Sequence, residues 1–221
     1  MTDAALGAES GCTAVPPAEL RTLDGATNAA AALVVTAFLA PLMLLISLAI
    51  WLDDGGPAFF RQRRVGRGGR VFHCIKFRSM TVGADALLAE RLSEDVEARA
   101  EWELLRKLRD DPRVTRVGRF LRRSSLDELP QLFNVVRGEM RLVGPRPILE
   151  EEVALYGVHF RRYCRVRPGV TGLWQVSGRS GLSFRRRVVM DVAYVRRRSV
   201  WVDLRILVGT LPAVLLQRGS C

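Results

Sequence analysis

The sequence predicts an α+β protein, in which a mainly helical cytosolic domain with one small β-hairpin is anchored to a membrane by its N-terminal helix and by interfacial helices. Three observations predict this class. Residues 29–52 carry no charge, residues 58–77 alternate aromatic or β-branched with basic positions, and later segments repeat apolar residues at helical spacing. A chain of 221 residues is long enough for one domain with a real core.

The uncharged segment 29–52 is long enough to cross a hydrocarbon core of about 30 Å as a helix. Pro41, in its middle, lacks a backbone donor and favours a kink. We therefore expect a re-entrant helix over residues 29–56 that turns back to the face it entered, and a kinked helix that fully spans the membrane is the alternative. Residues 1–28 precede it as an acidic tail, without the basic region that opens a signal peptide. The arginines that follow the helix place its C-terminal side in the cytoplasm; they are Arg61, Arg63, Arg64, Arg67 and Arg70.

Two elements are predicted directly after the membrane segment. Residues 58–77, around the glycine-rich turn at residues 66–69, predict the β-hairpin. Residues 84–110 place leucines and valines on one side of a single charged amphipathic helix, which Asp111 and Pro112 stop. This helix is expected to be peripheral.

The remaining elements are shorter until the C-terminus. Residues 129–136 predict a helix that breaks near Gly138, and residues 141–143 predict a short extended stretch. Residues near 199–216 predict a helix with one apolar face. That face fits an interfacial helix and a buried core helix about equally well.

Composition restricts the partners without choosing between them. The net charge of +11 indicates polyanionic partners, either nucleic acid or lipid headgroups and nucleotides. The four cysteines are widely scattered, and only two histidines could join them as soft-metal ligands. A zinc site or a disulfide framework is therefore not expected, and the thiols are expected to be reduced and cytosolic. The cysteines are Cys12, Cys74, Cys164 and Cys221, and the histidines are His73 and His159.

An acidic pair, Asp127 and Glu128, lies in the run 122–132, which begins with two arginines. The two carboxylates could serve as nucleophile and metal ligand, while arginines bind a phosphorylated substrate by bidentate hydrogen bonds. Ser125 and Glu128 also have the spacing of a capping box at a helix start. The two interpretations are compatible, because a helix N-terminus lowers the pKa of a carboxylate in its first turn and keeps it anionic.

Three basic residues are candidates for binding an anion. Prolines on both sides restrict the backbone of Arg146, although a rigid turn explains the same pattern. The glycine-punctuated loop 168–179 could present backbone amides and Arg179 to a phosphate. Lys76 is one of only two lysines in an arginine-rich chain, which suggests that this position requires a compact ammonium, with compositional chance as the alternative.

Asp191 is the last candidate. It could complete an acidic site with Asp127 and Glu128, although an ion pair with the arginines at 185–187 is the ordinary explanation.

Taken together, these runs resemble the bacterial sugar transferase family, the monotopic phosphoglycosyl transferases that start the assembly of cell-surface glycans. The resemblance covers residues from about 29 to 216, and the motifs occur in family order. Members carry a re-entrant helix kinked at a Ser-Pro pair, and here the pair is Ala40 and Pro41. The matching segments are 56–62, 64–66, 76–80, 111–115, 125–132, 142–147, 167–172, Asp191 and Tyr194.

The resemblance implies a two-step reaction on a phosphate. Asp127 would attack the β-phosphorus of a UDP-sugar and expel UMP, leaving a phosphosugar on the carboxylate. Undecaprenyl phosphate would then accept the phosphosugar. Mg²⁺ would be held by Asp127 and Glu128, and Glu128 could also contact the acceptor phosphate. The residues expected to bind the phosphates and uridine, or to support the site, are Lys76, Arg146, Pro147, Arg179 and Asp191.

The resemblance also implies an organisation and a location. It implies an acidic tail (1–28), a re-entrant membrane helix (29–56) and a cytosolic catalytic domain (57–221), at the inner membrane of a bacterium. Its partners would be a UDP-sugar, here UDP-galactose or UDP-glucose, undecaprenyl phosphate and anionic inner-membrane lipids, with no nucleic acid. A homodimer is left open. The competing hypothesis is a non-catalytic basic protein, anchored to the membrane, that binds a partner or serves as a scaffold.

Overall fold

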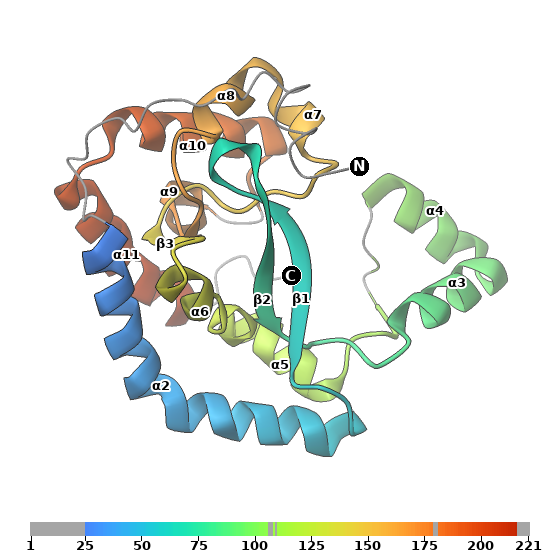
Figure 1. Cartoon of the computed structure of the whole chain (residues 1–221). Coiled ribbons are helices and arrows are strands. Elements are labelled where there is room, and N and C mark those ends of the chain that lie inside the picture. Colours follow the sequence, from blue (N-terminus) through green and yellow to red (C-terminus); the bar gives the residue numbers. More distant parts are fainter. Residues whose placement is uncertain (1–24, 106–107, 109, 179–180, 216–221) are drawn as a thin grey trace.

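The computed structural model describes residues 25–105, 108, 110–178 and 181–215. These residues form a mostly helical structure with two small sheets (Figure 1). The elements are α2 (Gly25–Asp54), β1 (Phe59–Val65), η1 (Arg67–Gly69), β2 (Val71–Phe77), α3 (Ala84–Glu94), α4 (Val96–Leu105), α5 (Arg116–Ser124), η2 (Leu126–Glu128), α6 (Gln131–Val136), β3 (Arg141–Val143), α7 (Val153–Tyr156), η3 (Gly157–His159), α8 (Phe160–Tyr163), β4 (Gly169–Thr171), α9 (Leu173–Ser177), α10 (Phe184–Arg197) and α11 (Val200–Leu215).

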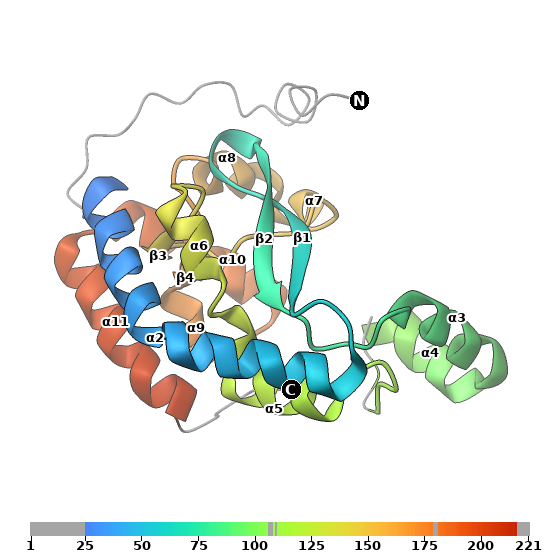
Figure 2. The same cartoon turned by 60° about the horizontal axis from the view of Figure 1, so that its bottom comes forward.

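Helix α2 contains Pro41 and is the one helix in the described part of the chain that is long and apolar enough to cross a membrane. Figures 1 and 2 show that it bends about halfway along its length. Its inner side is buried against the rest of the domain at both halves, for example at Ala32 and Ile50. Its outer side is apolar and exposed, at Leu33, Val34, Phe38, Leu44, Leu45, Leu48 and Leu52.

The predicted β-hairpin is confirmed. Strands β1 and β2 pair antiparallel from Phe59 opposite Phe77 to Val65 opposite Val71. The register puts every second residue of each strand on the same face, and this face includes Gln62, Arg64 and Lys76.

The segment 141–143 is extended as predicted, but it is strand β3 of a parallel pair with β4, which the sequence did not indicate. The backbones approach so closely that a Cβ added at Gly169 would lie 2.0 Å from the Gly144 nitrogen. Only glycine fits such a contact. The parallel pair therefore fixes the start of the segment that carries Arg146.

The prediction of one helix over residues 84–110 is wrong. Two helices, α3 and α4, are separated by Asp95, which has an extended backbone and accepts a hydrogen bond from the Ala98 nitrogen at 2.9 Å through its carboxylate. This contact is an N-terminal cap, and it starts a new helix where a continuous periodic pattern suggested none. The two helices stand away from the rest of the domain (Figures 1 and 2).

Helix α11 has one side packed against the domain and one exposed side. Ile206 and Asp203 are buried, and Asp203 accepts a hydrogen bond from the Tyr194 hydroxyl at 2.7 Å. On the other side, Trp201 and Val208 are exposed. The predicted single apolar face is therefore divided between a packed side and an exposed side.

Candidate active site

The acidic pair lies on a tight turn between two helices. Helix α5 ends at Ser124, and Ser125 has a left-handed backbone with φ 58°, the only non-glycine residue with positive φ among those described. Asp127 and Glu128 follow in the 3₁₀ turn η2. The predicted capping box is wrong, because the Ser125 side chain makes no capping hydrogen bond and Glu128 turns toward Lys76 instead.

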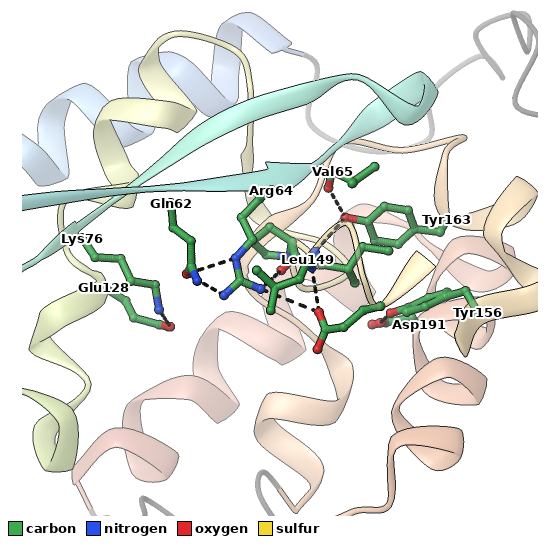
Figure 3. Close-up of polar contacts among 12 residues, drawn as sticks. Gln62, Arg64, Val65, Lys76, Glu128, Leu149, Tyr156, Tyr163 and Asp191 are labelled. Atoms are coloured by element: carbon green, nitrogen blue, oxygen red, sulfur yellow. Dashed lines mark hydrogen bonds and ion pairs between the residues drawn. The ribbon is translucent and has the colours of Figure 1, made fainter. Parts of the chain in front are cut away.

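Lys76 bridges the two carboxylates from strand β2. Its Nζ atom lies 2.7 Å from the Glu128 Oε1 (Figure 3). It also lies 4.0 Å from the Asp127 Oδ2. The contact joins residues that are far apart in sequence, and it depends on the register of the hairpin.

The pKa values of the two carboxyl groups are shifted in opposite directions. Burial raises the pKa of Asp127 to about 6, although Lys76 opposes the shift. Burial also raises the pKa of Glu128, but Lys76 and Arg146 outweigh it, and the net result lies below the usual value. The predicted lowering of the Asp127 pKa by a helix N-terminus is therefore wrong. Asp127 is still largely anionic at neutral pH and is more basic than an ordinary aspartate, which suits a nucleophile.

Arg146 is held over an aromatic ring. Its guanidinium carbon lies 5.7 Å from the centre of the Trp174 ring, and that of Arg187 lies 4.9 Å from the same ring. Next to it, the carbonyl of Pro147 accepts a hydrogen bond of 3.0 Å from Arg64, which is only 6% exposed. The turn is thus held by specific partners, and Arg146 is pre-positioned with less side-chain freedom to lose when an anion binds.

A cleft of about 930 Å³ brings the predicted residues together. Lys76, Asp127, Glu128 and Arg146 all line it. Pro147 lines a smaller recess of about 50 Å³, which shares Lys76, Glu128 and Arg146 with the cleft. Arg122, from the two arginines that precede the acidic pair, also lines the cleft. Several further lining residues were not candidates in the sequence, although strand alternation from Lys76 could have indicated the first of them; they are Gln62, Ser79, Trp174, Gln175 and Arg187.

One predicted site residue in the described part of the chain, Asp191, does not join this group. Asp191 lies on α10, does not line the cleft, and accepts a hydrogen bond of 2.7 Å from the buried Tyr156 hydroxyl. Its described partner is therefore this tyrosine and not the arginines at 185–187. Burial raises the pKa of Asp191 to about 7. Arg179 lies outside the described residues.

The acidic pair fits a magnesium ion. No group of three or more potential ligand side chains occurs among the described residues. Mg²⁺ is nevertheless often bound by one or two carboxylates, with substrate phosphates and water completing the octahedron. Asp127 and Glu128 supply such a pair at the wall of the cleft.

The fold and the cleft together define a class of protein: an enzyme that acts on phosphates and carries one long apolar helix. The chain matches the family model described as bacterial sugar transferase over residues 21–217 and belongs to this family. The family that the sequence motifs suggested is thereby confirmed.

Curated relatives carry names that agree with this family. The chain is 50% identical over 182 residues to the exopolysaccharide production protein ExoY of Sinorhizobium fredii, covering 82% of this chain and 80% of the relative. It is 49% identical over 180 residues to the undecaprenyl-phosphate galactose phosphotransferase of Salmonella typhimurium, covering 81% and 38%. It is 44% identical over 193 residues to the UDP-glucose:undecaprenyl-phosphate glucose-1-phosphate transferase of Caulobacter vibrioides, covering 84% and 67%.

Proposed function

We propose that this protein transfers a hexose 1-phosphate from UDP-galactose or UDP-glucose to undecaprenyl phosphate and releases UMP, as the first membrane step of exopolysaccharide, capsule or O-antigen synthesis. The observation that carries the proposal is the half-buried acidic pair bridged by Lys76, in a cleft that also contains Arg146. The names of the relatives cited above support the choice of substrates.

The first step is a substitution at the β-phosphorus. An oxygen of the Asp127 carboxylate forms a bond to this phosphorus, and the bond from the phosphorus to the bridging oxygen breaks. UMP leaves with that oxygen and its electron pair. Lys76 and Arg146 lie where they can bind the phosphate oxygens, and their positive charges offset the negative charge that develops there.

The second step regenerates the enzyme. A phosphate oxygen of undecaprenyl phosphate attacks the same phosphorus, and the Asp127 carboxylate leaves as an anion. The product is a diphosphate-linked lipid sugar. Mg²⁺ held by Asp127 and Glu128 would neutralise phosphate charge in both steps.

The acceptor lipid explains the apolar helix. A polyprenyl chain stays in the bilayer, so the phosphate must be met at the headgroup level. Val35 and Leu39 of α2 line the same cleft as Asp127. We therefore place α2 in the inner membrane of a bacterium, with the rest of the domain on the cytosolic side.

The experiment that tests this function measures UMP release from a panel of UDP-sugars, with and without undecaprenyl phosphate. We expect release with UDP-galactose or UDP-glucose, and a phosphosugar on Asp127 by mass spectrometry when the acceptor is omitted. Asp127→Asn should abolish both, because an amide is not an anionic nucleophile. Glu150→Gln, at an acid that pairs with Arg63, is the matched control and should retain activity. Near-normal UMP release by Asp127→Asn would reject the covalent mechanism.

The same assay tests the metal. Activity should disappear in a chelator and return with Mg²⁺, because hard phosphate and carboxylate oxygens suit this ion. Full activity in a chelator would reject the metal role. Absence of UMP release under every condition would instead favour the non-catalytic binding or scaffold protein.

A further inference from the structure

Two glutamine side chains line the cleft, and the proposed phosphate chemistry gives them no role. They are Gln62 on β1 and Gln175 on α9. The Oε1 atom of Gln175 is buried and has no hydrogen-bond partner in the described part of the chain. A buried carbonyl without a partner is unfavourable and rare in native proteins, and the Gln175 side chain lines both the cleft and the small recess, so its amide is a candidate to pair with a hydrogen-bonding group of a ligand.

The orientation of the Gln62 amide is fixed by Arg64. The Arg64 Nε and Nη2 atoms both donate to the Gln62 Oε1, at 3.2 and 2.7 Å (Figure 3). A guanidinium has only donors, so the oxygen of the amide must face it and the NH₂ group must face away. Arg64 is itself held by the Pro147 carbonyl. The NH₂ group of Gln62 is therefore held in place at the wall of the cleft.

The two amides differ in chemistry from the cations around them. Lys76 and Arg146 offer only donors and match phosphate oxygens, which only accept. A free carbonyl oxygen has no match on a phosphate. A hydroxyl both donates and accepts, so it matches the NH₂ of Gln62 and either end of the Gln175 amide.

Position decides which part of a nucleotide sugar these amides meet. Gln175 lines the small recess together with Lys76 and Glu128, and the Lys76 Nζ lies 4.0 Å from the Asp127 Oδ2. Gln175 also lines the larger cleft that contains Asp127, so a group that reaches Gln175 from this cleft lies beside the phosphate that Asp127 is proposed to attack. In a UDP-hexose the group with hydroxyls at that position is the hexose, while the uracil is separated from it by a ribose and a second phosphate.

We propose that Gln62 and Gln175 bind hydroxyls of the transferred hexose and so determine which UDP-hexose is accepted. The inference rests on the proposed function. A site built to hydrogen-bond a hydroxyl discriminates strongly against an analogue that lacks it, because the polar groups of the site are then left unpaired. The same logic applies in reverse when the amide is removed from the protein.

The test uses the first half-reaction, UMP release without lipid acceptor, with the preferred UDP-hexose and a set of its monodeoxy analogues. Gln175→Met keeps the length of the side chain and removes its polar atoms. We expect at least a tenfold loss of kcat/KM with the parent hexose. With the one deoxy analogue that lacks the hydroxyl bound by Gln175, the variant and the wild type should have similar rates.

Gln62→Glu is the companion variant. It still accepts both hydrogen bonds from Arg64 but presents an oxygen where the amide presented donors, so it separates recognition from folding. We expect a loss of kcat/KM that is matched by a different deoxy analogue. Inhibition by UMP should be unchanged in both variants, because UMP lacks the hexose.

Three results would overturn the inference. If inhibition by UMP weakens together with kcat/KM, the amides bind the nucleotide and not the sugar. If the loss is the same for the parent and for every deoxy analogue, the amides have a structural role. If both variants keep wild-type kcat/KM, the two glutamine side chains do not contact the substrate. The proposed function fails in a distinguishable way, since wild-type enzyme would then release no UMP from any UDP-hexose.

Discussion

At the scale of single residues, the cleft shifts the pKa values of two carboxyl groups that are neighbours in the sequence in opposite directions. Asp127 is raised to a pKa of about 6 by burial, whereas Glu128 pairs with Lys76 at 2.7 Å and stays below its usual pKa. Environments that push two acids apart in this way are typical of groups with different roles. Asp127 is thus the better nucleophile, and Glu128 the better permanent anion for a metal or a lysine.

Substitution of Arg146 by lysine tests whether the cleft needs a guanidinium or only a positive charge. Arg146→Lys keeps the charge but loses the planar fork and the stacking on Trp174 at 5.7 Å. We expect kcat/KM for UMP release to fall on the order of 10- to 100-fold, the effect of losing a hydrogen bond to a charged group. Arg185→Lys, at an exposed arginine of α10, is the matched control. Equal activity of the two variants would reduce Arg146 to a turn residue.

Asp191 gives a prediction for stability and pH. Its folded pKa is raised to about 7 from 3.8 by burial, so its contribution to stability is full below pH 3.8 and is lost as pH rises through 7. Asp191→Asn keeps an oxygen that accepts from the Tyr156 hydroxyl and removes the buried charge. The variant should therefore be more stable than wild type by up to ~4 kcal/mol at pH 8, with a difference that shrinks toward pH 4.

Thermal unfolding of both proteins in the same detergent between pH 4 and pH 8 measures this difference. A lower Tm for Asp191→Asn at pH 8 would show that the carboxylate has a charged partner. If UMP release also falls in a well-folded variant, the supporting role in the site that the sequence suggested for Asp191 gains evidence.

Lys76, Arg146 and the acidic pair could be named as candidates from the sequence because they are conspicuous by type, and all four line the cleft. The local environment of these residues was not predicted correctly. The left-handed backbone of Ser125 and the burial of Asp127 depend on tertiary packing, so the capping box and the lowered pKa were both wrong. Sequence reasoning also omitted Gln62 and Gln175, because uncharged amides form no recognisable pattern.

At the scale of elements, Arg78 joins the end of the apolar helix to the strand that carries Lys76. Both terminal nitrogens of Arg78 bind the Asp54 carboxylate at the end of α2, and its Nε donates to the Pro57 carbonyl at 2.6 Å. The Arg78 side chain is only 9% exposed. The position of α2 and the position of Lys76 are therefore mechanically linked.

A double-mutant cycle on Asp54 and Arg78 measures this link. We expect Asp54→Ala and Arg78→Ala to be non-additive, with an interaction energy of about 1–3 kcal/mol in unfolding, because each removes the partner of a shielded charge. Both single variants should also slow UMP release by disturbing Lys76. The more exposed pair Arg91 and Asp95, at the junction of α3 and α4, is the control cycle. Additive effects at Asp54 and Arg78 would show that the two elements are held by other contacts.

The elements were predictable where the signal is local. The hairpin has a strict alternation and a glycine turn, and α6 ends where expected, near Gly138 with φ 74°. The parallel pairing of β3 with β4 was not predictable, because it joins three-residue strands that lie far apart in the chain. The break at Asp95 was missed because apolar periodicity continues across it.

At the scale of the whole molecule, both ends of α2 are attached to the same domain. Near its start, Asn28 Oδ1 accepts a hydrogen bond from the Leu142 nitrogen of β3 at 3.1 Å, and at its end Asp54 binds Arg78. A straight α-helix of 30 residues would be about 45 Å long, more than the thickness of the hydrocarbon core. Figure 1 shows that the helix bends around the domain, and both of its ends contact this domain.

This arrangement gives the last prediction, which concerns topology. A helix that spans the membrane would put its two ends on opposite sides, and the contacts of Asn28 and Asp54 with one domain could not both form. We therefore expect the re-entrant form, with residues before α2 on the cytosolic side. Cys12, which lies outside the described residues, is a native probe once Cys74, Cys164 and Cys221 are changed to serine.

An impermeant maleimide added to intact cells should fail to label Cys12, and should label it once the inner membrane is opened. A permeant maleimide provides the control for reactivity. Asn28→Leu removes the acceptor of the hydrogen bond from the Leu142 nitrogen and should lower the stability of the protein. The labelling pattern should not change, because the bend at Pro41 and the other packing contacts of α2 maintain the topology. Labelling of Cys12 in intact cells would establish a spanning helix and reject the re-entrant form. The proposed function would not be rejected by that result, because UMP release that depends on Asp127 does not require the re-entrant form.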